Sequence, residues 1–195
     1  LDYLRIAREI RRMGLPTVMG VDSHWTGSFR QAAGAVPLGL ALRACFSHAF
    51  VPGYPQYELV RRLGFAPNQV LWNVYACDAA LFAAAAQRRV RWAKRVLFAG
   101  RLVPVKRVDL AVEAFLAASA SEEGWKLIIA GEGPEQASIP AHPSVEVLGR
   151  IGALELMHEA MNSSVFLHTA IHEPWGVVIH EMATAGLPLI STAEC

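Results

Sequence analysis

Residues 172–181 read His-Glu-Pro-Trp-Gly-Val-Val-Ile-His-Glu and carry two carboxylates, Glu173 and Glu181, with seven residues between them. An apolar run over residues 165–169 comes first, so the pattern predicts a strand, a loop and the start of a helix. Such a junction points backbone N–H groups and the positive end of a helix at an anion. With Glu173 in the loop and Glu181 about two turns into the helix, at ~1.5 Å of rise per residue, the carboxylates reach opposite ends of a phosphorylated ligand. The stretch therefore predicts a site for a nucleotide-linked sugar.

The composition indicates a folded protein of one large domain or two small ones. The chain has 195 residues, of which 53% are hydrophobic and 18% charged, so it can fill a core. A net charge of +1 argues neither for nor against a nucleic-acid partner, and since no dense basic run indicates one, we expect none. The three cysteines, Cys45, Cys77 and Cys195, are odd in number and far apart. They are typical of a reducing compartment, so we expect a cytoplasmic protein with no structural disulfide or zinc site.

Both ends of the chain suggest a fragment. The sequence opens at Leu1 without a methionine, inside an amphipathic helical pattern, and stops at Cys195 just after an apolar run over 187–190. We therefore expect elements of the natural protein to be missing on either side. The longest apolar stretch, residues 32–50, contains a proline, an arginine and a histidine, so it does not predict a membrane-spanning helix.

Apolar segments with strand character alternate with helical segments along the chain. Helices of 10–15 residues between strands indicate parallel β-α-β units. One series of units covers residues 1–78 and a second covers 94–195, and the Ala- and Arg-rich residues 79–93 between them predict a linker. Two such series predict an α/β protein with two Rossmann-like lobes and a ligand at the carboxyl ends of the strands. The predicted strands are 17–21, 45–51, 69–74, 96–99, 125–130, 145–148, 165–169 and 187–190, and the predicted helices include 1–13, 29–44, 54–63, 106–119 and 152–161.

Five blocks of the second series follow one another in order: Phe98-Ala-Gly-Arg-Leu, Lys106-Arg-Val-Asp-Leu-Ala-Val-Glu-Ala-Phe, Ile128-Ile-Ala-Gly-Glu-Gly-Pro, Leu148-Gly-Arg-Ile and the Glu173–Glu181 segment. With this order the chain resembles the retaining GT-B-fold glycosyltransferases called group 1, or glycosyltransferase family 4. The resemblance is strong over 94–195 and weaker upstream. It implies that residues 1–78 are the C-terminal part of the acceptor-side lobe, and that residues 94–195 are a truncated nucleotide-sugar-binding lobe.

The resemblance implies roles for four charged residues. Arg101 and Lys106 would neutralise a pyrophosphate and stabilise it as a leaving group, which removes the need for a metal ion. Glu173 would lie beside the transferred sugar and orient it, without acting as a covalent nucleophile. Glu181 would accept hydrogen bonds from the ribose hydroxyls. Position alone leaves simpler alternatives open. Arg101 and Lys106 could be a solvated surface pair. Glu173 could be a carboxylate stabilised at a helix N-terminus, and Glu181 an exposed helix residue.

Other residues of the same blocks acquire binding roles by resemblance. Trp175, Gly176 and Val177 would offer backbone N–H groups to phosphate or sugar, and glycine lets the backbone approach closely. Arg150 and Ile151 stand where the family holds the nucleobase, mainly through backbone. Packing for Trp175 and a surface cation for Arg150 are the alternatives.

Neither a metal nor NAD is expected. The Gly131-Glu-Gly-Pro turn lacks the third glycine of a dinucleotide fingerprint. His158, His168, His172 and His180 do not form a His-Glu-x-x-His motif, so we expect most of them to be ordinary surface or half-buried histidines. In the first series, His24 lies on a loop after a strand, and a role on the substrate side is one reading of it.

The resemblance implies transfer of a sugar from a nucleotide diphosphate sugar to an acceptor hydroxyl with retention of configuration. The donor is then the substrate and no further cofactor is needed. The acceptor would be a glycan, a lipid or a small molecule, and association with the inner face of a membrane stays open. Alternatives are a non-catalytic nucleotide-sugar-binding module and a nucleotide-dependent Rossmann oxidoreductase. Residues 1–195 alone are expected to be inactive, because the family's glycine-rich loop and N-domain histidine would lie upstream.

Overall fold

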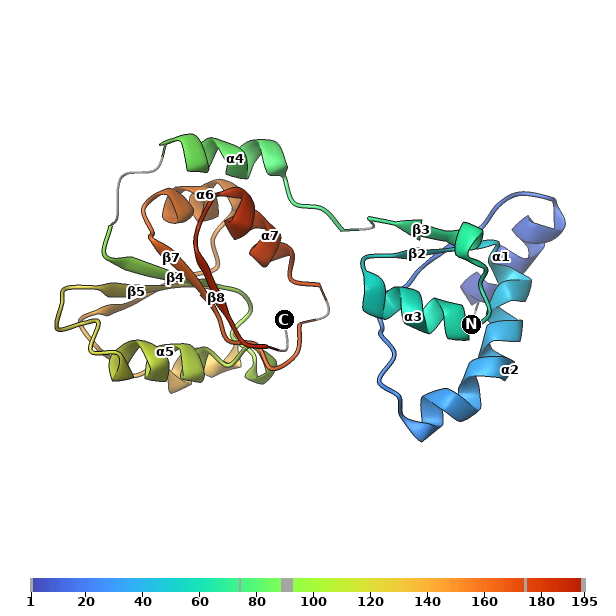
Figure 1. Ribbon diagram of the computed structural model, residues 1–195, viewed down its shortest axis with the longest axis horizontal. Helices are drawn as coiled ribbons and strands as arrows, with labels where there is room; N and C mark the ends of the chain where they lie inside the picture. Colours follow the sequence, from blue (N-terminus) through green and yellow to red (C-terminus); the bar gives the residue numbers. More distant parts are fainter. Residues whose placement is uncertain (1, 74, 89–92, 174, 194–195) are drawn as a thin grey trace. The chain divides into compact units, whose positions relative to one another are not determined.

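The computed structural model describes residues 2–73, 75–88, 93–173 and 175–193 (Figure 1). The chain divides into two compact units, Leu1–Tyr75 and Ala76–Cys195. Each unit has a sheet of parallel strands with helices packed beside it, which confirms the predicted α/β class. Cys45 and Cys77 are free thiols, and Cys195 lies outside the described residues. No helix in the described ranges is both long and apolar enough to cross a membrane.

The first unit is built on a short sheet with the strand order β1-β2-β3. Its core forms where β2, β3 and helix α3 meet, with Val51, Val60 and Phe65 completely buried. Helix α2 begins at a serine cap, since the Ser28 hydroxyl accepts a hydrogen bond from the Gln31 N–H at 3.3 Å. The elements are α1 (Asp2–Arg12), β1 (Val18–Gly20), α2 (Phe29–Cys45), β2 (His48–Val51), α3 (Tyr54–Arg62), η1 (Pro67–Gln69) and β3 (Val70–Trp72).

The second unit has five parallel strands in the order β6-β5-β4-β7-β8. From β4 the chain first adds strands on one side of the sheet, then returns to add β7 and β8 on the other. This is a Rossmann half, and its topological switch point lies between β4 and β7. The elements are α4 (Ala79–Arg88), β4 (Arg95–Ala99), η2 (Pro104–Lys106), α5 (Val108–Ala117), β5 (Lys126–Ala130), η3 (Pro134–Ser138), β6 (Val145–Gly149), α6 (Ala153–Met161), β7 (Val165–His168), α7 (Val177–Thr184) and β8 (Leu189–Ser191).

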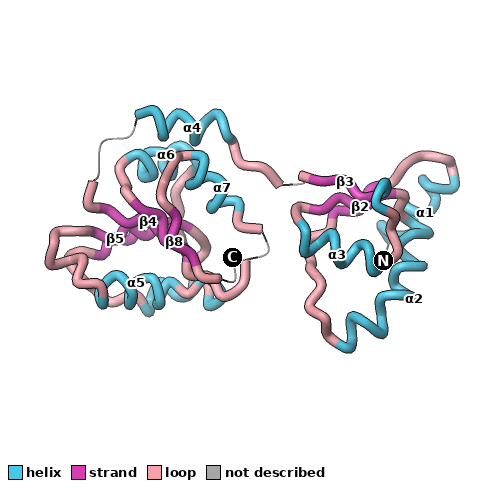
Figure 2. Tube along the Cα trace, viewed as in Figure 1, coloured by secondary structure: helices cyan, strands magenta, loops and turns pink. Residues whose placement is uncertain are grey.

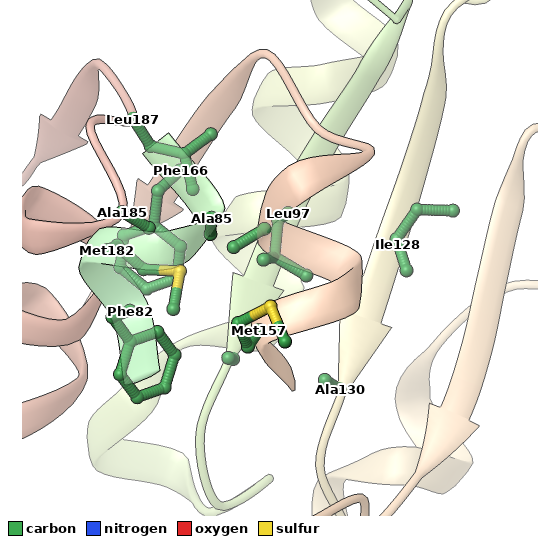
Figure 3. Close-up of a cluster of buried hydrophobic side chains, with 12 residues drawn as sticks. Phe82, Ala85, Leu97, Ile128, Ala130, Met157, Phe166, Met182, Ala185 and Leu187 are labelled. Atoms are coloured by element: carbon green, nitrogen blue, oxygen red, sulfur yellow. The ribbon is translucent and has the colours of Figure 1, made fainter. Parts of the chain in front are cut away.

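Alternating side chains of the central strands fill both faces of this sheet. Figure 2 shows α5 on one side and α4, α6 and α7 on the other. Leu97 and Ile128 pack on the side of the three helices, together with Met157 of α6 (Figure 3). Phe98 and Ile129, one position later on the same strands, pack on the side of α5. Both faces are covered, which explains why these strands are continuous apolar runs without polar alternation.

The predicted linker, residues 79–93, is corrected by the structure over its first ten residues. Residues 79–88 form α4, and its Phe82 and Ala85 are completely buried in the second unit's core (Figure 3). The Ala-rich composition that suggested a linker is also that of a strong helix former. Its single phenylalanine and an alanine three residues later supply the buried stripe. The boundary between the units thus falls between residues 75 and 76, and residues 89–92 lie outside the described ranges.

Candidate functional site

Two loops meet at the switch point of the second sheet, one after β4 and one after β7. The hydroxyl of Thr169 donates to the backbone carbonyls of Lys106 and Arg107, at 3.1 and 2.7 Å. The N–H of Ile171 donates to the carbonyl of Val105 at 3.0 Å. These bonds fix the end of the first loop against the start of the second, so side chains that are more than 60 residues apart in sequence come together.

Three charged or polar side chains converge where these loops touch. Lys106 Nζ donates to Oε2 of Glu173 in an ion pair, and only 14% and 10% of the two side chains are exposed. Nε2 of His168, the last residue of β7, lies 3.2 Å from the same Glu173 oxygen, with 3% of its side chain exposed. Neither ring nitrogen of His168 makes an aligned hydrogen bond to any described residue. Glu173 therefore has one strong partner and a second within reach.

The surroundings of Glu173 keep its carboxylate charged. The closeness of His168 lowers the pKa of Glu173 most, burial raises it, and the contact with Lys106 lowers it again, so that the pKa is held at about 2. At neutral pH the group is a fixed negative charge and not a proton donor. It suits the orientation of a ligand through hydrogen bonds donated by the ligand's hydroxyls.

A cavity of about 430 Å³ opens at the carboxyl ends of β4, β5 and β6, and its described lining does not include Lys106, His168 or Glu173. Arg101 is exposed at its wall, and the described part of the chain offers it no acidic partner in an ion pair. Glu181 of α7 is half-buried on the same wall, and burial raises the pKa of its carboxyl. Cation, carboxylate and apolar wall together suit a ligand with phosphate, hydroxyl groups and a flat ring. The lining is completed by Ala99, Gly100, Ala130, Gly131, Glu132, Arg150, Ile151, Leu156 and Val178.

The Gly131-Glu-Gly-Pro turn has a packing role at this edge. A Cβ on Gly131 would lie 1.9 Å from the carbonyl oxygen of Gly100, so only glycine lets the loops after β4 and β5 approach this closely. The loops then pair, because the N–H of Leu102 donates to the carbonyl of Glu132 at 2.8 Å. Glu132 also reaches the guanidinium of Arg150 at 3.5 Å, although both side chains are largely exposed.

The start of α7 differs from the prediction. The helix begins at Val177, so Glu181 lies just over one turn inside it and not about two. Gly176 precedes the helix in the left-handed region, with φ of 66°, which keeps the helix from extending toward Glu173. The ring of Trp175 packs edge-on against His180 with centroids 4.9 Å apart, and its Nε1 is buried without a hydrogen-bond partner among the described residues. The Trp175 side chain thus has a packing contact, as the alternative to a binding role predicted.

Replacing Gly176 by alanine is expected to destabilise the second unit by about 2 kcal/mol or more. Alanine in the left-handed region costs ~1–2 kcal/mol. Its Cβ would also lie 2.8 Å from Cδ1 of Ile179 and 3.0 Å from Cγ of Glu173. Gly124→Ala is the matched control, since Gly124 has φ of +80° but nothing within 4 Å of an added Cβ. Urea unfolding of both variants measures the difference, and equal losses would contradict a steric role for Gly176.

The structure also separates the histidines that the sequence treated alike. His168 is buried against Glu173 and is thus an exception to the expectation that most of these histidines are surface or half-buried. The available signal was its place at the end of an apolar strand, two residues after Phe166 and on the same face, where the rings stack with centroids 6.0 Å apart. Within the described ranges, no group of three or more His, Cys, Asp and Glu side chains has a metal-binding arrangement. His24 belongs to the first unit, in the loop after β1, and its role stays a prediction.

Comparison with known proteins places this geometry in a family context. The family described as Glycosyl transferases group 1 matches residues 86–195, more than half of the chain. A GDP-mannose-dependent alpha-mannosyltransferase of Mycobacterium tuberculosis is 29% identical over 196 aligned residues, covering 93% of this chain and 50% of the relative. The chain thus spans about half the length of that relative, or less of the others.

Solved glycosyltransferase structures share the fold of both units. The crystal structure of HepE from Anabaena in complex with UDP gives a TM-score of 0.69 at 17% identity, covering 97% of this chain and 56% of HepE. The pneumococcal O-GlcNAc transferase GtfA, solved with UDP and GlcNAc, gives a TM-score of 0.67 at 16% identity, covering 98% of this chain and 40% of GtfA. At these identities the likeness concerns the fold, which is that of GT-B glycosyltransferases.

Proposed function

The chain belongs to the group 1 glycosyl transferases, and on that premise we propose that the protein transfers a sugar from a nucleoside diphosphate sugar to an acceptor hydroxyl, with retention of anomeric configuration. The observation that supports this most is the convergence of two cations and two carboxylates at one end of the second sheet. Arg101 and Glu181 line its cavity, and Lys106 and Glu173 form a buried ion pair between the loops after β4 and β7. A nucleoside diphosphate sugar presents matching groups: two phosphates, a ribose and a sugar.

The donor lies along the cavity in our proposal. Its diphosphate faces Arg101 and Lys106, because charge-assisted hydrogen bonds to phosphate are the strong interactions that these cations offer. The ribose hydroxyls donate to Glu181, and the base lies near Ile151 at the end of β6. The backbone N–H groups at the start of α7, from Trp175 to Val177, face the phosphates or the sugar, since the first N–H groups of a helix have no partner within it.

The transferred sugar lies beside Glu173. In the reaction, the bond from the anomeric carbon to the phosphate oxygen breaks as the bond to the acceptor oxygen forms on the same face. The leaving phosphate takes the acceptor proton, while Arg101 and Lys106 stabilise the negative charge that develops on it. Glu173 orients the sugar by accepting hydrogen bonds from its hydroxyls and forms no covalent bond to it. The two cations neutralise the leaving diphosphate, as a metal ion would in other enzymes, and no further cofactor takes part.

The acceptor side belongs to the first unit. We assign a glycan, a lipid or a small molecule as acceptor and a cytoplasmic site of action. A loop of this unit carries His24, a candidate for contact with the acceptor. The relative described as GDP-mannose-dependent makes GDP-mannose the first donor to test, and the UDP complexes of HepE and GtfA make UDP-sugars the next.

Nucleotide binding tests the proposal directly. We expect GDP or UDP to raise the thermal midpoint of the protein and NADH to leave it unchanged. A ligand at about 100 times its Kd adds about 2.7 kcal/mol to the free energy of unfolding. The protein at its natural length is then incubated with nucleotide sugars, and release of the nucleotide is followed with and without acceptors. Stabilisation by NADH alone would favour a Rossmann oxidoreductase, and nucleotide binding without any transfer would favour a non-catalytic module.

A further inference from the structure

His168 is a buried polar side chain whose hydrogen-bonding capacity is unused. Its side chain is 3% exposed, and both ring nitrogens lack an aligned partner among the described residues. Buried polar groups are almost always paired, so an unpaired one calls for an explanation. The oxygen recorded within reach of Nε2 is Oε2 of Glu173, at 3.2 Å. This distance is within the range of a hydrogen bond.

In the structure the same Glu173 oxygen is paired with Lys106. Under the proposed function, Lys106 also binds a second anion, the diphosphate of the donor. If its ammonium moved to the phosphate, the carboxylate of Glu173, only 10% exposed, would lose its partner. An unpaired charge in such a place is strongly unfavourable. The site therefore needs a second partner for Glu173 whenever the donor is bound.

We propose that His168 is that partner, a positioning residue whose Nε2–H donates to Glu173 when Lys106 turns to the donor diphosphate. This inference rests on the proposed function. His168 is well placed for the role, because strand β7 fixes its backbone and the ring of Phe166 stacks against its own. With His168 bound, the carboxylate stays aimed at the transferred sugar while the lysine stabilises the leaving group. His168 itself touches neither donor nor acceptor.

The test compares three replacements of His168. Glutamine can place an amide N–H near the position of Nε2, asparagine reaches only as far as Nδ1, and leucine fills the space without a donor. We expect all three variants to bind nucleoside diphosphate with a Kd within about twofold of the unchanged protein. At natural length, kcat for sugar transfer should fall by about tenfold or more in H168L and H168N, and stay within about threefold in H168Q. Equal loss in H168Q and H168L, or no loss in any variant, would overturn the proposal.

A second measurement tests the contact without relying on catalysis. In a Lys106→Met background Glu173 depends on His168, so H168L should lower the thermal midpoint more than it does when Lys106 is present, and H168Q should not. The same shift of H168L in both backgrounds would show that His168 and Glu173 are not coupled, and would overturn the proposal. If the unchanged protein bound no nucleotide while this coupling held, the proposed function would fail but the contact would stand.

Discussion

Replacing Glu173 by glutamine is expected to lower the rate of sugar transfer by about 100-fold or more and to leave nucleoside diphosphate binding intact. The carboxylate is paired with Lys106 in the structure, and in our proposal it meets only the sugar. A free nucleotide lacks that sugar, so its Kd should stay within about twofold, whereas kcat and kcat/KM should fall together. Calorimetry with the nucleotide and turnover of the protein at natural length measure the two effects separately.

The second glutamate of the motif should behave in the opposite way. Glu181 lines the cavity and meets the ribose, which substrate and free nucleotide share. Glu181→Gln should therefore weaken nucleotide binding by about tenfold, the loss of a charge-assisted hydrogen bond. Glu132→Gln is the matched control, because Glu132 lines the same cavity but is largely exposed. If Glu173→Gln and Glu181→Gln lost nucleotide affinity equally with the fold intact, this division of roles would be wrong.

Replacing Lys106 by methionine is expected to weaken nucleoside diphosphate binding by tenfold or more. A hydrogen bond between the ammonium and phosphate is worth about 1.5–3 kcal/mol, and 1.4 kcal/mol corresponds to a factor of about ten. Arg107→Gln is the control, since the neighbouring cation pairs with Asp109 at 2.9 Å, whereas Lys106 pairs with Glu173. Calorimetry on the two variants decides it: if Lys106→Met bound nucleotide as tightly as Arg107→Gln, the lysine would not be a phosphate ligand.

The same lysine variant should change the acid stability of the second unit. The pKa of Glu173 is lowered from 4.5 to about 2, so its favourable contribution to stability is complete above pH 4.5 and is lost as the pH falls toward 2. Without Lys106 one cause of the lowering is gone, so the pKa of Glu173 rises, and the stability lost below pH 4.5 is smaller and its loss ends at a higher pH. Urea midpoints between pH 7 and pH 3 measure this. Superimposable acid profiles for Lys106→Met and the unchanged protein would contradict it.

The sequence was sufficient to locate the strands of the second unit and its helices α5 and α6. Strand β4 was predicted over residues 96–99 and is found at Arg95–Ala99, and α5 was predicted over 106–119 and is found at Val108–Ala117. These elements could be predicted because strand and helix periodicities are local properties of the chain. The α/β class and the approximate division into two units followed from their alternation. The family resemblance also singled out the four charged residues that converge at the end of the sheet.

Helix α4 shows where local pattern fails. Its alanines are compatible with a linker, a surface helix or a buried helix. Alanine has no large side chain, so the sequence shows no apolar stripe that identifies a buried face. Only the position of Phe82 and Ala85 against Met182 decides that α4 belongs to the core of the second unit. Packing between elements distant in sequence makes that decision, and no periodicity encodes it.

The sequence by itself determined which residues carry charge near the switch point, and the tertiary structure alone decided which of them touch. His168 looked like three other histidines until β7 placed it, 3% exposed, within 3.2 Å of Glu173. Lys106 comes from a loop 67 residues earlier, and the hydrogen bonds of Thr169 to that loop set the ion pair. Burial and distance together hold the pKa of Glu173 at about 2. Both are properties of the assembled sheet, because a parallel sheet brings to one edge the ends of strands that the sequence keeps far apart.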